Sequence, residues 1–82
     1  MTPAARIIDQ FGVEALARWT GRHRSRIHAW TWSRERGGTG GVVPVALRAK
    51  IIASAQVERA VALSFADFEP REGESYLLAV EA

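Results

Sequence analysis

The sequence predicts an all-α fold, a compact bundle of four to five helices followed by a short C-terminal tail. Apolar residues recur at helical spacing along most of the chain, and glycine or proline separates one such stretch from the next. The 82 residues suit one small domain, and a hydrophobic share of 48% is too high for a disordered chain.

The first two helices have recognisable ends. Thr2 is a helix-capping residue type, and Pro3 is favoured at the first helical position. Gly12 is the predicted end of this helix, whose apolar face carries Ile7, Ile8 and Phe11. The second helix covers residues 13–19, which are good helix formers, and Gly21 follows where a tight turn needs a positive φ.

A third helix is expected to start near Arg22 or His23 and to run to about Trp32. Four glycines among residues 37–41 then predict a flexible loop that connects to the next helix. That helix begins at Pro44, and its helical pattern continues through residues 45–55 towards Ala60.

The C-terminal part predicts one more helical turn and then a tail. Ser64 to Asp67 resembles a capping box with Asp in place of Glu, and Pro70 ends the turn. The tail carries Tyr76, Leu77, Leu78 and Val80. It forms a strand, a helical turn, or a segment that becomes ordered only in a dimer.

Four residues between positions 17 and 30 have the spacing of a helix-turn-helix. A small residue at Ala17 allows close helix crossing, and Gly21 permits the turn. Ile27 and Trp30 are three residues apart, so they share the face of the third helix that anchors it in the core. Trp19 is expected to be a further core anchor.

The stretch LARWTGRHRSRIHAW and the later stretch VVPVALRAKIIASA resemble the lambda-repressor-like, Cro-type helix-turn-helix family of phage repressors and related small regulators. This resemblance covers about residues 4–60. It implies an all-α fold and binding of operator DNA, usually as a dimer. We therefore expect a helix-turn-helix domain over residues 1–68 and a tail, a candidate dimerisation segment, over residues 69–82.

A helical wheel predicts which side of the third helix meets DNA. His23 and Trp30 fall near Ile27, towards the core, whereas Ser25, Ala29 and Trp32 fall on the opposite side. Small residues bordered by long cations suit a helix in the major groove. Trp32 is expected to pack beneath the fourth helix, with contact to DNA sugar and phosphate as the alternative.

The resemblance implies that the base-facing positions are His23, Arg24, Ser25, His28 and Ala29. Arg24 is the preferred reader of a guanine edge, because a guanidinium can bond O6 and N7 together. Arg22 and Arg26 are expected to contact DNA phosphates. Weaker candidates for phosphate contacts are Arg18, Arg34, Arg36 and Arg48. The glycine loop is a further candidate, through its amides and Arg36.

Charge and composition also bear on which other classes of function are compatible with the chain. Residues 1–36 carry a net charge of +4, residues 37–56 of +2 and residues 57–82 of −4, which indicates a basic surface for a polyanion and an acidic end kept away from it. The chain has no cysteine and only two histidines, both among arginines, so we expect no metal site and no cofactor. No spacing of acids suggests a catalytic pair, and we expect no enzyme.

The chain lacks an apolar run near the ~20 residues of a membrane span and shows no signal-peptide pattern, so a cytoplasmic protein is expected. The leading interpretation is a sequence-specific regulator, a repressor of phage or prophage type that binds a palindromic operator. An activator that touches RNA polymerase through its acidic end is an alternative, as is a protein-interaction module such as an antitoxin or phage adaptor. Phe65, Phe68 and the tail are candidates for homodimer contacts.

Overall fold

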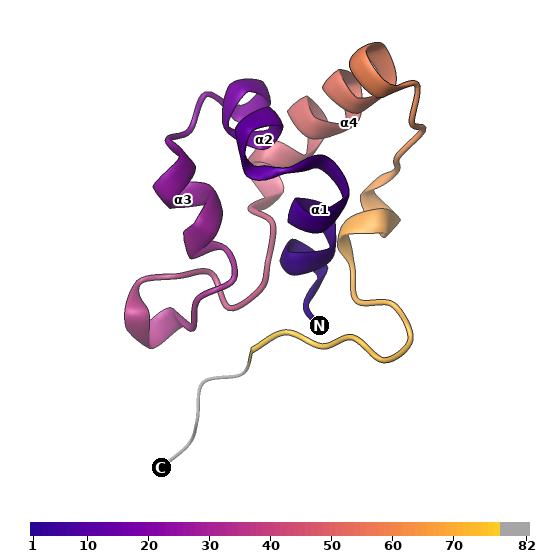
Figure 1. Cartoon of the computed structure of the whole chain (residues 1–82). Helices are drawn as coiled ribbons and strands as arrows, with labels where there is room; N and C mark the ends of the chain where they lie inside the picture. Colours follow the sequence, from indigo (N-terminus) through magenta and orange to yellow (C-terminus); the bar gives the residue numbers. More distant parts are fainter. Residues whose placement is uncertain (78–82) are drawn as a thin grey trace.

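A computed structural model describes residues 1–77, and this part of the chain contains helices and no strand. Four α-helices follow one another in the order α1 (Pro3–Phe11), α2 (Val13–Thr20), α3 (Arg24–Ala29) and α4 (Val45–Arg59), with 3-10 turns at Arg34–Arg36 (η1) and Phe65–Phe68 (η2) (Figure 1). The all-α prediction is confirmed. The residues of the predicted tail beyond position 77 lie outside the described residues.

The local stop and start signals act as the sequence predicts. The Thr2 hydroxyl accepts a hydrogen bond from the backbone N–H of Ala5 at 3.2 Å and caps α1. Gly21 ends α2 in the left-handed conformation with φ of 71°, a backbone region that costs glycine little. The capping box of Ser64 and Asp67 is present, and the backbone N–H of Ser64 is the main cause that lowers the pKa of the Asp67 carboxyl.

One apolar core joins all four helices and η2. Its fully or almost fully buried members include Ile7, Phe11, Leu16, Trp19, Ile27, Trp30, Val43, Leu47, Ile51 and Phe68. The rings of Phe11 and Trp19 meet edge to face with centroids 5.3 Å apart. Trp19 and Trp30 are thus the core anchors that their positions predict.

The third helix is shorter than predicted. It starts at Arg24 and ends at Ala29, and the chain then tightens into i→i+3 turns, with the N–H of Trp32 donating to the carbonyl of Ala29 at 3.0 Å. The amide of Thr39 donates to that same carbonyl at 3.2 Å. Because the following loop satisfies the end of α3, the helix does not continue to Trp32.

The glycine loop folds back against the end of α3 instead of remaining an open connector. The amides of Gly38, Thr39, Gly40 and Gly41 donate to the carbonyls of residues 29–33. A Cβ atom at Gly38 would collide with the carbonyl oxygens of Ala29 and Trp32, so this close approach requires glycine. The predicted phosphate contact through these amides is therefore wrong, because they are already bonded.

Arg6 holds the C-terminal segment against α1. Its guanidinium donates to Glu74 at 2.7 Å and to the carbonyl oxygens of Asp67 and Glu69 at 2.8 and 3.1 Å. Only 13% of the Arg6 side chain and 9% of the Glu74 side chain are exposed. One side chain thus fixes η2 and the segment that passes below α1 (Figure 1).

The two phenylalanines of η2 lie in different environments. Phe68 is fully buried in the core of its own chain, so the prediction that it serves self-association is wrong. Phe65 is 52% exposed and stays a candidate for contact with another chain. The difference arises because one face of this short turn packs on α1 and α4 while the other faces solvent.

The Arg6–Glu74 pair predicts acid sensitivity. Hydrogen bonds from the Arg6 side chain, and next from the backbone N–H of Arg71, lower the pKa of Glu74 from 4.5 to about 2. Since the folded pKa lies below the unfolded one, the pair contributes stability that is complete above pH 4.5 and is lost as pH falls towards 2. As pH falls across this range, the urea midpoint of the native chain should decrease. Glu74→Gln should have a lower midpoint at neutral pH, and its midpoint should change less with pH. Glu72→Gln, an exposed control, should keep the native slope, and equal slopes for all three chains would contradict the assignment.

Candidate nucleic-acid interface

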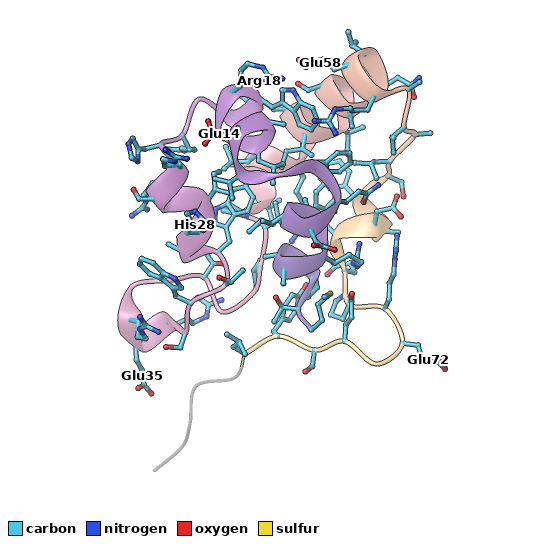
Figure 2. The ribbon with its side chains drawn as sticks, in the orientation of Figure 1. Glu14, Arg18, His28, Glu35, Glu58 and Glu72 are labelled. Carbon is cyan, nitrogen blue, oxygen red and sulfur yellow. The ribbon has the colours of Figure 1, made fainter. Side chains whose placement is uncertain are left out.

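Exposed basic and polar side chains cover the start and one face of α3. All six consecutive residues from Gly21 to Arg26 are exposed, and His28 is exposed as well, whereas Ile27 is fully buried. Three residues, 21–23, connect α2 to α3, and α3 forms one edge of the molecule in Figure 2. The structure therefore brings Arg22, Arg24 and Arg26 together on one short, accessible segment.

His23 caps α3 and does not pack in the core, contrary to the helical-wheel prediction. Its Nδ1 accepts the backbone N–H of Ser25 at 3.1 Å and lies 3.0 Å from the Ser25 hydroxyl. The wheel fails here because His23 is extended, with φ of −67° and ψ of 150°, and precedes the helix. The imidazole thus satisfies one backbone N–H at the start of α3.

Arg24 is held by a carboxylate of the neighbouring helix. Its guanidinium donates to Glu14 of α2 at 2.6 Å, and the two side chains are 63% and 76% exposed. Exposed pairs of this kind contribute only ~0–1 kcal/mol, so Arg24 can exchange Glu14 for another acceptor at little cost. Arg24 stays available at the surface.

Two positions predicted to face outward differ from expectation. Ala29 is buried because the glycine loop covers it, so the predicted contact with a thymine methyl is wrong. Trp32 does not pack beneath α4; it is 38% exposed, and the guanidinium of Arg36 lies 5.6 Å from its ring centroid. Both differences follow from the early end of α3.

The weaker phosphate candidates separate into three environments. Arg34 and Arg36 are exposed on η1. Arg18 is exposed, but its guanidinium donates to one carboxylate oxygen of Glu58 in α4 at 2.7 Å, and this hydrogen bond is the main cause that lowers the pKa of Glu58. The indole N–H of Trp19 donates to the other oxygen at 2.9 Å.

Arg48 is the candidate that the structure removes. Its side chain is 6% exposed, its Nε donates to the carbonyl of Val43 at 2.9 Å, and its guanidinium lies over the Phe68 ring. A cation in this position stabilises the junction of α4 and η2 and cannot reach a phosphate outside.

The acidic end lies away from α3. Figure 2 shows Glu72 at the edge of the molecule opposite His28. Other acids of this end are engaged locally: Glu74 with Arg6, Asp67 with Arg71, and Glu69 with the hydroxyl of Tyr76, whose pKa this hydrogen bond raises. The negative charge of residues 57–77 thus stays apart from the basic segment.

Within residues 1–77 no group of three or more His, Asp or Glu side chains is placed to hold a metal ion. No helix in this range is both long and apolar enough to cross a bilayer. Comparison with models of protein families, with curated proteins and with solved structures gives no match.

Sequence reasoning missed two features of this surface. It did not identify Glu14 as the partner of Arg24, because the two are ten residues apart and meet only through the packing of α2 on α3. It also missed that Arg22 and Arg26 line one pocket with the start of α4. The only signal in the sequence that Arg22 and Arg26 act together is that both are expected to contact phosphates.

The cap assigns His23 a measurable role in stability. His23→Ala should lower the free energy of unfolding by ~0.5–2 kcal/mol because Ser25 loses its acceptor, whereas His23→Asn, a good capping residue, should restore most of it. Urea denaturation followed by tryptophan fluorescence measures both. An alanine variant as stable as the native chain would show that the imidazole does not cap α3.

Proposed function

We propose that this protein is a sequence-specific DNA-binding regulator of the helix-turn-helix type, and that it acts as a repressor of phage or prophage kind. The observation that carries the proposal is the exposed row of cations on α3, whose opposite face is fixed to the core by the buried side chains of Ile27 and Trp30. A three-residue connection with a left-handed glycine joins α2 to α3, as in helix-turn-helix motifs.

In this proposal α3 enters the major groove of double-stranded DNA. Arg24 leaves Glu14 and bonds a guanine edge, with Ser25 and His28 as neighbouring base contacts. Arg22 and Arg26 bind phosphates, which position the helix without reading sequence. The separation of the acidic end from α3 supports this orientation, because repulsion from DNA then falls on the far side.

We further propose that the protein binds a palindromic operator as a homodimer. A six-residue recognition helix makes few contacts, and a two-fold pair doubles them over half-sites about 34 Å apart. Phe65 and Val57, which are 52% and 84% exposed, are apolar surfaces for such pairing. Occupation of a promoter by the dimer would exclude RNA polymerase.

The central test selects bound sequences from a random duplex library and then measures affinity against salt. We expect one enriched palindrome and a steep loss of affinity with rising salt, because each phosphate contact contributes a slope of about −0.9. Arg24→Ala should cost ~1–3 kcal/mol and relax preference at one base pair, whereas Arg22→Ala should weaken all sequences alike.

Arg71→Gln is the matched control, since it removes an exposed cation that pairs with Asp67. It should leave both affinity and sequence preference unchanged. The absence of duplex binding at low salt would end the proposal in favour of a protein-interaction module.

Glu14→Gln gives the opposite effect. This substitution removes a negative charge beside the interface and releases Arg24 from its ion pair, so affinity for duplex DNA should rise about two- to fivefold. The control Glu72→Gln makes the same charge change at the opposite edge of the molecule and should have little effect. Gel-shift titrations of both variants measure the difference, and equal effects would place Glu14 away from DNA.

A further inference from the structure

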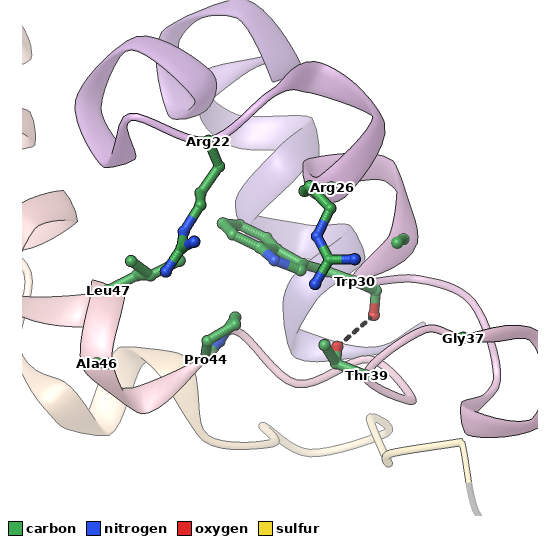
Figure 3. Close-up of a pocket in the computed structure, with 9 residues that line it drawn as sticks. Arg22, Arg26, Trp30, Gly37, Thr39, Pro44, Ala46 and Leu47 are labelled. Carbon is green, nitrogen blue, oxygen red and sulfur yellow. Dashed lines mark hydrogen bonds between the residues drawn. The ribbon is translucent and has the colours of Figure 1, made fainter.

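A pocket of about 230 Å³ opens between α3, the glycine loop and the start of α4 (Figure 3). Arg22 and Arg26 line one side, Ala46 and Leu47 of the first turn of α4 line the other side, and Trp30 and Thr39 complete the lining (Figure 3). The volume exceeds the roughly 30 Å³ share of one water molecule several times. We propose that this pocket binds a single tetrahedral oxyanion, namely a phosphate group.

The charge of the pocket has no internal counterion. Its lining contains two guanidinium groups and no carboxylate. Among residues 1–77 neither Arg22 nor Arg26 takes part in an ion pair, whereas Arg6, Arg18, Arg24, Arg48 and Arg71 all do. Two uncompensated guanidinium forks at one cavity match the hydrogen-bonding geometry of phosphate oxygens.

Trp30 adds a neutral hydrogen-bond donor to the lining of the pocket. The indole N–H of Trp19 donates to Glu58, whereas no side-chain hydrogen bond within residues 1–77 starts from the indole N–H of Trp30, a residue that is 3% exposed. In the described part of the chain, every side-chain nitrogen or oxygen that is shut off from solvent has a hydrogen-bond partner. The indole N–H of Trp30 is therefore reached by solvent. Figure 3 shows the indole between the side chains of Arg22 and Arg26, and all three residues line the pocket.

The remaining lining favours an anion without adding competing acceptors. The Thr39 hydroxyl lies 2.9 Å from the carbonyl of Trp30, so it fixes the loop instead of facing a ligand (Figure 3). The 15-residue helix α4 begins at Val45, after the N-cap residue Pro44, without a side-chain cap, so the positive end of its dipole borders the pocket at Ala46. A phosphate here would accept from both arginines and from the indole.

Two sources supply this chemistry: a phosphate of the DNA backbone, or a free phosphate or phosphorylated small molecule. The site itself stands on the pocket alone, and only the DNA source rests on the proposed function. A backbone phosphate held here would fix α3 and α4 to the same strand. A free phosphate would instead neutralise the arginines and compete with DNA.

The test follows the indole N–H signals of the ¹⁵N-labelled full chain by NMR. Trp19→Phe and Trp32→Phe identify the Trp30 signal by elimination. Sodium phosphate is titrated against sodium chloride at equal ionic strength, and a selected duplex is titrated separately. With phosphate, the Trp30 signal should shift saturably while the Trp19 and Trp32 signals do not.

Variants define the contacts. Arg22→Gln with Arg26→Gln should weaken phosphate binding at least tenfold, whereas Arg71→Gln, which removes an exposed cation that pairs with Asp67, should bind as the native chain does. Trp30→Phe keeps a ring in the core and removes the donor, so calorimetry should show weaker phosphate binding. Dispersed amide spectra of each variant establish that it is folded.

Each outcome decides the proposal. A duplex that shifts the Trp30 signal and is displaced by phosphate supports the backbone source, whereas a duplex that binds without moving a phosphate-sensitive signal supports the free anion. A shift that stays linear in phosphate, or one that survives in the double arginine variant, overturns the pocket even if DNA binds. A saturable phosphate shift without duplex binding overturns the proposed function and leaves the pocket intact.

Discussion

The burial of Ile27 and Trp30 is the constraint on which the exposed surface depends. A helix of six residues has too few internal hydrogen bonds to persist alone in water. It persists here because these two side chains enter the core from one face and the glycine loop closes over its end. Everything that α3 presents to solvent is oriented by that attachment, so a change in the core alters the direction of the arginines.

The concentration of cations at the start of α3 opposes the helix dipole, at ~0.3–1 kcal/mol for each cation in the first turn. Two local features offset this cost. The imidazole of His23 accepts the amide of Ser25, and the carboxylate of Glu14 lies 2.6 Å from the guanidinium of Arg24. Both are exchangeable surface contacts. The arrangement is tolerated in the free protein and still leaves the cations able to turn towards an anionic partner.

Features set by a few neighbouring residues could be predicted from the sequence. The Thr2 cap, the positive φ at Gly21 and the Ser64 capping box all depend on local backbone chemistry. The end of α3 could not be predicted, because it depends on a loop that returns to bond its last carbonyls. The burial of Arg48 was equally inaccessible, since η2 covers it from twenty residues away. Helical periodicity says nothing about such distant coverage.

The hydrogen bond from the amide of Ser75 to the carbonyl of Met1, 3.4 Å long, brings a late part of the backbone next to its beginning. The path of the chain therefore almost closes on itself, and Arg6 secures that closure. The packing of the helices against one another therefore does not depend on where along the polypeptide the chain starts. A circularly permuted chain, joined at this point and opened at the exposed Ala62, should therefore keep the core contacts between the helices.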